Sequence, residues 1–355
     1  MREAVTLIES ESPLCPVQAL AEKTENAVYF YLFYPLRKNG HNLKACWVCN
    51  CREAPERLDA GDKLSMMPQG GFRHAPGGMT VSPEGLHITW LPDGDSAVLL
   101  QNGEVLAVIP PKAGLYDFPG FSRYAAGQNC YAWELPPEHA AYWKEQAHAA
   151  EALWRESHTS AFWQGMQNKH LTVLNEFFGK NTGYYAIDDG KYPLRAVIEG
   201  NRDGVTYGFT AFLSIFPQPE IEAFIRGAEE HRRIEFGFAA EDAVSGVKMQ
   251  AYNCFMAMAK AICRDTVFFA HGHTNTWEGI PGFCAFLFVN ARAVRGLPAP
   301  EYGSFAGDPI NLLWAVPVTR EEYDFVVKNG VSDLLHRAKD ISRIHIFDGR
   351  PKFNL

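Results

Sequence analysis

The chain has 355 residues, a formal net charge of −8 and the composition of an ordinary globular protein. Its charged residues are spread along the sequence, and no stripe of lysine and arginine favours binding to a nucleic-acid backbone. No apolar run approaches the about 20 residues that span a bilayer, and the N-terminus lacks the apolar core of a secretory signal. We therefore expect a soluble, cytoplasmic protein with neither a nucleic-acid partner nor a membrane segment.

Residues 1–135 are rich in strand signals and predict a β-rich N-terminal domain. The pair Asn102-Gly103, which separates two apolar segments, is the strongest hairpin signal in the chain. Residues 61–84 are rich in glycine and proline, so we expect a long, mobile loop there with little to pack. The expected strands cover residues 27–34, 43–51, 86–91, 96–100, 104–109 and 130–135.

Residues 136–179 predict a long helical connector between two domains. The pair Pro136-Pro137 opens the helix, whose apolar faces carry many aromatic side chains. Two breaks are expected within it, at His158-Thr159-Ser160 and at Gly165. Gly179 begins a run of helix-ending and turn residues, which marks the best domain boundary.

Residues 180–355 mix strand and helix signals and predict an α+β domain, with helices packed on a mixed or antiparallel sheet. Residues 205–216 alternate with the period of a strand, and residues 233–239 do so again with Ile234 and its alternate neighbours inward. Residues 251–263 are apolar nearly all round and predict a buried helix. Further strands are expected at 194–198, 266–270, 283–289, 310–316 and 343–347, and a short helix at 221–226.

Residues 310–337 carry the clearest local pattern in the chain. They begin with an apolar run that predicts a strand buried on both faces, and Pro317 ends this strand. Thr319 and Glu322 have the spacing of a capping box at the start of a helix. Gly330 interrupts the apolar face of that helix, so a second short helix is expected after it.

The same stretch resembles the closing segment of the suppressor of fused (SUFU) family. In that family an apolar strand ends in proline, Thr-x-x-Glu follows, and a glycine precedes a turn with paired leucines. The corresponding residues in this chain are Pro317, Thr319, Glu322 and Gly330. Gly272-His273-Thr274, which lies between two expected strands, is similar to a Gly-His-Thr loop of bacterial members. The order of elements between Tyr184 and Arg337 also fits the family.

The resemblance implies a C-terminal SUFU-like domain in a protein that is not an enzyme and that needs no cofactor or metal. Animal members bind a transcription factor and hold it inactive, and bacterial members include immunity proteins that neutralise toxins. This chain is most similar to the bacterial class, which implies a protein partner such as a cognate toxin. Its net negative charge would suit a basic toxin. The further partner-binding region of the animal proteins is not recognisable here, and no partner-binding residue is carried over.

His271 and His273 support an alternative hypothesis from another class of function. Two histidines at this spacing after an expected strand can bind one metal ion, so the chain would be a metal-dependent hydrolase. Glu278 or His231 would then be recruited to complete the site. The competing interpretation, which we prefer, is a loop in which the His273 side chain binds backbone groups. A third possibility is a scaffold whose loop at residues 61–84 orders only on a partner.

Other polar and sulfur-containing groups have simpler interpretations. Cys46, Cys49 and Cys51 have the spacing of half a zinc site, but strand-forming residues between them direct the thiols to opposite faces. No second cysteine pair completes the site, so we expect reduced core or surface thiols. Asp188-Asp189 predicts a solvated turn, and Met249 and the two methionines after it predict core packing. No nucleotide-binding loop, zinc-protease motif or serine-hydrolase motif occurs.

Overall fold

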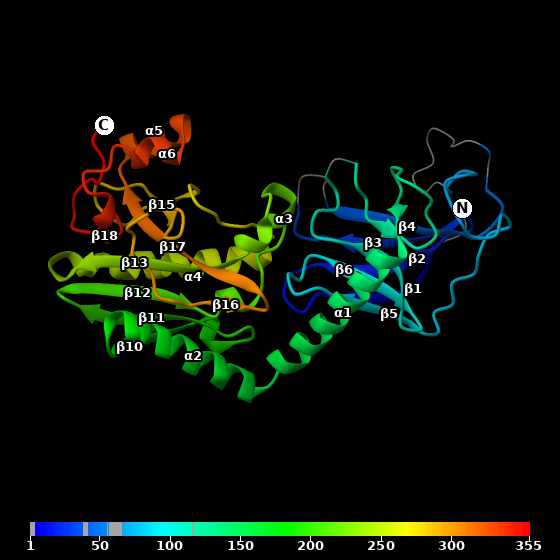
Figure 1. Cartoon of the computed structure of the whole chain (residues 1–355), viewed down its shortest axis with the longest axis horizontal. Coiled ribbons are helices and arrows are strands. Elements are labelled where there is room, and N and C mark those ends of the chain that lie inside the picture. The colour runs from blue at the N-terminus through cyan, green and yellow to red at the C-terminus, as the bar shows by residue number, and fades with distance from the viewer. Residues whose placement is uncertain (1–3, 38–41, 55, 57–65, 116) are drawn as a thin grey trace. The chain divides into compact units, whose positions relative to one another are not determined.

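The computed structural model describes residues 4–37, 42–54, 56, 66–115 and 117–355 (Figure 1). They form two compact units, which we call the N-terminal unit and the C-terminal unit. The N-terminal unit contains Met1–His158, Pro219–Ile225 and Cys263–Thr266. The C-terminal unit contains Thr159–Gln218, Arg226–Ile262 and Val267–Leu355. Two short segments from the second half of the sequence therefore belong to the N-terminal unit.

The N-terminal unit is built on two β-sheets. Their strands are β1 (Val5–Glu11), β2 (Gln18–Lys23), β3 (Ala27–Phe33), β4 (Leu43–Asn50), β5 (Leu86–Trp90), β6 (Ala97–Gln101), β7 (Glu104–Ile109), β8 (Phe121–Ser122) and β9 (Trp133–Glu134). The first sheet is antiparallel throughout, with the strand order β1-β2-β3-β4. The second has the order β5-β6-β7-β8-β9 and is antiparallel except for its last pair. The strand signals of this region therefore correspond to two separate sheets.

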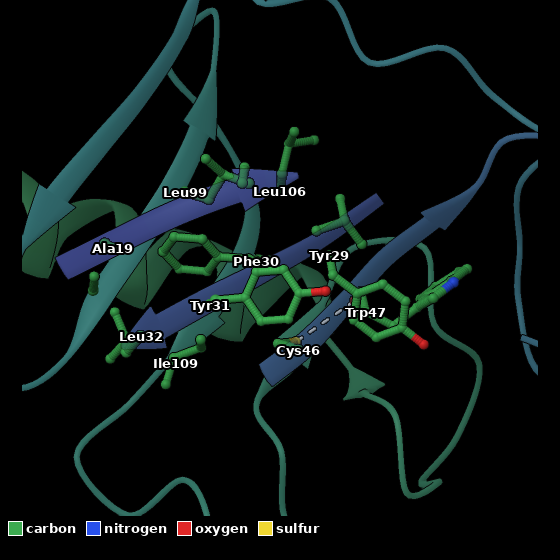
Figure 2. Packing of buried hydrophobic residues seen from close by; sticks show 14 of the residues in the cluster. Ala19, Tyr29, Phe30, Tyr31, Leu32, Cys46, Trp47, Leu99, Leu106 and Ile109 are labelled. Atoms are coloured by element: carbon green, nitrogen blue, oxygen red, sulfur yellow. Dashed lines mark hydrogen bonds between the residues drawn. The ribbon is translucent and has the colours of Figure 1, made fainter. Parts of the chain in front are cut away.

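Large apolar side chains from both sheets form the core of the N-terminal unit (Figure 2). Phe30 on β3 and Trp47 on β4 are fully buried, as is Leu99 on β6. The neighbouring residue Val98 faces the other side of the second sheet, because successive side chains of a strand alternate. There it packs in a cluster with Ala147 of helix α1 (Pro137–Ser157). The second sheet is thus buried on both faces, which explains its nearly continuous apolar strands.

The C-terminal unit is built on one mixed sheet with the strand order β10-β11-β12-β13-β17-β15-β14. These strands are β10 (Asn181–Ile187), β11 (Arg195–Arg202), β12 (Val205–Ala211), β13 (Arg233–Glu241), β14 (Thr274–Thr276), β15 (Ala285–Asn290) and β17 (Asp308–Val318). Two short strands, β16 (Ser304–Phe305) and β18 (Ile346–Phe347), pair with β17 and β13 respectively. Only β13 makes parallel pairs, with β17 and β18, so the expected mixed α+β architecture is confirmed.

The remaining helices are α2 (Ser160–Phe178), α3 (Ile221–Phe224), α4 (Lys248–Arg264), α5 (Arg320–Asn329) and α6 (Val331–Leu335). Helices α2 and α4 cover opposite faces of the mixed sheet, as two neighbouring residues of β12 show. Phe209 stacks on Phe178 of α2, whereas a Cβ at the next position back, Gly208, would overlap the ring of Tyr252 on α4. Adjacent strand residues face opposite sides, so both faces of the sheet are covered. No helix among the described residues combines the length and apolar character needed to cross a bilayer.

Several sequence expectations for the C-terminal part of the chain are wrong. Pro317 does not end its strand, because β17 continues to Val318 and pairs with β15 there. Residues 266–270 form no strand, because Thr266 takes a left-handed conformation with φ of 48° and the chain stays irregular until β14. The strand expected at 205–216 ends at Ala211, because Phe212 has φ of 78° and starts a 3-10 turn. Gly165 does not divide the connecting helix, which breaks only between α1 and α2.

Residues 61–65 of the expected mobile loop lie outside the described residues, and the rest of it is packed at some positions and exposed at others. Met67 is fully buried, and its backbone N–H donates to Asn50 Oδ1 while its carbonyl accepts from Asn50 Nδ2, each at 2.8 Å. The ring of His74 stacks on Trp47. Met67 and His74 therefore anchor the described part of this segment to β4.

Candidate functional site

The Gly272-His273-Thr274 loop joins the irregular segment before it to the short strand β14. The N–H of Gly272 donates to the carbonyl of Phe288 on β15, and the N–H of Phe288 donates to the carbonyl of His273, each at 2.8 Å. Gly272 has φ of 87°, a conformation that glycine adopts without strain. A Cβ at this position would also lie 2.8 Å from Val331 Cγ1 on α6. The loop is thus held between β15 and α6, and the two segments that carry the family resemblance meet at Gly272.

The side chains of His271 and His273 both contact neighbouring residues of the fold. The ring Nδ1 of His271 accepts a hydrogen bond of 3.2 Å from the backbone N–H of Asn290. The His273 ring packs against Phe268, with ring centroids 5.4 Å apart, and hydrogen-bonds the Phe268 backbone. Burial lowers the pKa of both histidines, so both imidazoles are neutral at neutral pH. The preferred interpretation, in which His273 binds backbone groups, is confirmed.

The metal-site alternative is not supported by the arrangement of ligating side chains. Among the described residues, no three His, Cys, Asp or Glu side chains are placed so that they could hold one metal ion. His271 and His273 therefore do not converge with Glu278 or His231 on a common centre. Structural and catalytic zinc sites need at least three protein ligands, so this part of the chain offers no basis for a metal-dependent hydrolase.

The closing segment confirms its predicted capping box and extends it. Thr319 Oγ1 accepts from the N–H of Glu322 at 3.2 Å, and Glu322 Oε2 accepts from the N–H of Thr319 at 2.8 Å. The other carboxylate oxygen of Glu322 accepts from the N–H of Phe353 at 3.1 Å. Glu322 is only 2% exposed. One carboxylate therefore fixes both the start of α5 and the C-terminal segment.

A hollow of about 350 Å³ lies beside α5, near the C-terminal residues. The guanidinium carbon of Arg337 lies 4.7 Å from the ring centroid of Phe325, over the apolar floor. The six residues that line it are Glu321, Asp324, Phe325, Lys328, Arg337 and Leu355. The sequence did not predict this site, because Arg337 and Leu355 reach α5 only through the fold. The only signal available was the i, i+3, i+4, i+7 spacing of the α5 residues.

Two clusters built on buried carboxylates lie inside the C-terminal unit. Asp308 accepts hydrogen bonds from Arg232 and from the buried Arg233, at 2.7–2.9 Å. Burial lowers the pKa of Arg233 to about 10, although Asp308 opposes this shift. Glu235, which is fully buried, accepts from Thr210 and Ser214, and His170 Nε2 of α2 lies 3.4 Å from its Oε1. Both carboxylates therefore accept hydrogen bonds from side chains of their own unit and stabilise the fold.

The cysteine cluster is a set of core thiols, as expected. Cys46 and Cys49 are fully buried on β4, and Cys51 is partly buried just after it. Burial raises the pKa of all three, that of Cys49 to about 12, so all three are protonated thiols at neutral pH.

The structure confirms the expected turn at Asp189 and corrects the expected burial of Met249. Asp189 has φ of 55° and lies in a turn, as expected. Met249 is 40% exposed at the start of α4, so its assignment to a core was wrong, whereas Met258 is buried.

One family model matches part of the chain. Residues 194–350 match the family model described as Suppressor of fused protein (SUFU). No curated protein matches the chain. Among solved structures, the chain is similar to a suppressor of fused homolog from Neisseria gonorrhoeae FA 1090, with 15% sequence identity and a TM-score of 0.36. That match covers 53% of this chain and 98% of the other. The family match takes in the Gly-His-Thr loop and the capping box of α5.

Proposed function

We propose that the chain is a non-catalytic inhibitor that sequesters a protein partner, because residues 194–350 match the suppressor of fused family model. The family match is the observation that carries the proposal, because the family suggests a protein-interaction role without catalysis. The site geometry supports it. His271 and His273 hold a loop against β15, and the buried carboxylates of the C-terminal unit are bound by internal donors.

We propose further that the partner is a toxin and that the chain is its cytoplasmic immunity protein, as in bacterial members of the family. The net charge of −8 supports a basic partner, because opposite charges accelerate encounter and oppose binding to acidic competitors. An immunity protein must bind its toxin before the toxin acts. Fast, charge-assisted association suits that requirement.

The proposal is tested by capturing the tagged full-length chain from cells of its own source. Bound proteins are identified by mass spectrometry, and the metal content of the same preparation is measured. We expect one stoichiometric protein partner and no stoichiometric metal. The variant His273→Ala should recover the same partner, because His273 only orders its own loop. A metal-loaded chain without a partner, or loss of metal and partner together in His273→Ala, would contradict the proposal.

The toxin assignment needs a second readout. The recovered partner is expressed alone, and then together with the chain, in a host that makes neither protein. Growth arrest by the partner alone, relieved by the chain, is the expected result. A partner that does not affect growth would remove the toxin assignment and leave the binding role intact.

A further inference from the structure

The hollow beside α5 has a regular arrangement of charge around an apolar centre. Glu321, Asp324, Phe325 and Lys328 follow one another at helical spacing, so they share one face of α5. Glu321 and Lys328 are about 10 Å apart along the axis at a rise of about 1.5 Å per residue. The face therefore has an acidic end, an aromatic centre and a basic end.

Among the described residues, the charged side chains around this hollow form no ion pair. None of the ion pairs formed by the described residues includes Glu321, Asp324, Lys328 or Arg337. Most charged side chains elsewhere in the C-terminal sheet are engaged, as Arg233 and Asp308 illustrate. Four unpaired charges around one apolar hollow are therefore available to another molecule.

This pattern is complementary to itself. When two copies of α5 lie antiparallel across a two-fold axis, the acidic end of each faces the basic end of the other. Glu321 then faces Lys328 of the second copy twice, and Asp324 and Phe325 of both copies meet near the axis. Arg337, which already lies over Phe325, is placed to pair with Asp324 across the axis and so offsets the repulsion between the two Asp324 side chains.

We propose that the hollow beside α5 is a homodimerisation surface, with a second copy of this chain as its occupant. A contact centred on one helix of ten residues is small, so the dimer is weak and forms in the micromolar range or above. Its ion pairs lie at an exposed rim, so the dimer weakens as salt concentration rises. The inference is independent of the proposed inhibitor role, which requires a different protein.

Charge reversal of the full-length chain tests the surface. Sedimentation velocity is measured from low micromolar to several hundred micromolar, first for the natural chain and then for Glu321→Lys and Lys328→Glu. Each substitution turns two attractions across the axis into two repulsions, so we expect dimerisation to weaken by at least about tenfold in each variant. Both positions are exposed, and circular dichroism checks that both variants remain folded.

Mixing the two variants is the decisive step. In a heterodimer of Glu321→Lys with Lys328→Glu, both cross-axis pairs become attractive again. The mixture should therefore dimerise although neither variant does so alone, and the double variant Glu321→Lys/Lys328→Glu should recover dimerisation by itself. The control is Glu145→Lys on α1, an exposed position in the N-terminal unit with the same change of charge, which should dimerise like the natural chain.

Two results would overturn the inference. One is a natural chain that stays monomeric up to several hundred micromolar. The other is a dimer that survives both single reversals, or that is not recovered in the mixture, because either outcome places the interface elsewhere. A partner captured from cells has no bearing on these measurements, so the homodimer and the inhibitor role can fail separately.

Discussion

Burial shifts the pKa of one titratable side chain in each unit of this protein, and the two shifts have opposite effects on proton binding. In the N-terminal unit, Asp95 is fully buried with Lys44 Nζ at 3.1 Å, and desolvation outweighs the lysine and raises the Asp95 pKa to about 6. In the C-terminal unit, His345 is 3% exposed, and its burial and the nearby charges of Arg343 and Lys352 lower its pKa to about 4. One unit holds a carboxylate that gains protons on folding, and the other holds an imidazole that loses them. The lesson is that a single chain can carry two proton linkages of opposite sign.

The largest expected effect comes from removing Asp308, which pairs with Arg232 and Arg233 in the C-terminal unit. Asp308→Ala leaves the buried Arg233 without a carboxylate, and we expect the free energy of unfolding of this unit to fall by about 3–5 kcal/mol. Chemical denaturation followed by hydrogen exchange of peptides from each unit measures it. The control Glu241→Ala breaks an exposed pair with Arg343 and should change stability by less than about 1 kcal/mol. Equal effects of the two substitutions would contradict the assignment.

Acid should weaken the C-terminal unit through His345. His345 has a pKa of 6.5 in the unfolded chain and of about 4 in the folded one. Between these pH values the unfolded state therefore binds a proton that the folded state does not. Stability from this group is therefore complete above about pH 6.5 and falls by about 3 kcal/mol as pH drops to about 4. Hydrogen exchange of β17 and β18 peptides across this range measures the loss. The variant His345→Asn should flatten the dependence, and an unchanged slope would exclude His345 as its source.

Acid should strengthen the N-terminal unit through Asp95. The folded pKa of about 6 lies above the unfolded value of 3.8, so the folded state binds more protons between these values. The contribution of this group to stability therefore decreases by about 3 kcal/mol as pH rises from about 4 to about 6. The neighbouring Asp93, whose pKa burial also raises, adds to the same trend. Exchange of β6 peptides in Asp95→Asn should show a smaller pH dependence than in the natural chain, and an equal one would refute the assignment.

The smallest expected effect is local to the C-terminal unit. Thr319→Ala removes the oxygen that accepts from Glu322 at the start of α5, and we expect a loss of about 1 kcal/mol. Thr319→Ser keeps the hydroxyl and should keep most of the stability. The N-terminal unit should exchange at the same rate in both variants. A matching change in that unit would show that the two units do not unfold separately.

Much of the fold follows from local sequence signals. The strand at 104–109 has the predicted limits, and the capping box of Thr319 and Glu322 forms as its spacing predicts. Six strands among the described residues were not predicted, and three of them, β8, β14 and β16, have only two or three residues. Of the longer ones, β1 and β2 are partly polar, and β10 follows a helix-ending signal and owes its extended form to pairing with β11.

Burial by tertiary contacts explains what local patterns missed at the candidate site. Alternation placed Ile234 inward and, by implication, Glu235 outward, yet α2 covers that second face and both residues are buried. The hollow beside α5 likewise joins residues from three separate segments. Local periodicity shows which side chains share a face, but it does not show what that face meets.

The most direct test of the inhibitor role is a titration of the captured partner with purified chain, with the partner's own activity as the readout. A sequestering inhibitor acts by binding, so activity should fall linearly and reach its floor at a fixed, near-equimolar ratio. Removal of the chain should then restore the activity. Complete and lasting loss of activity at a small fraction of one equivalent would mean that each chain inactivates many partners, which only a catalyst can do.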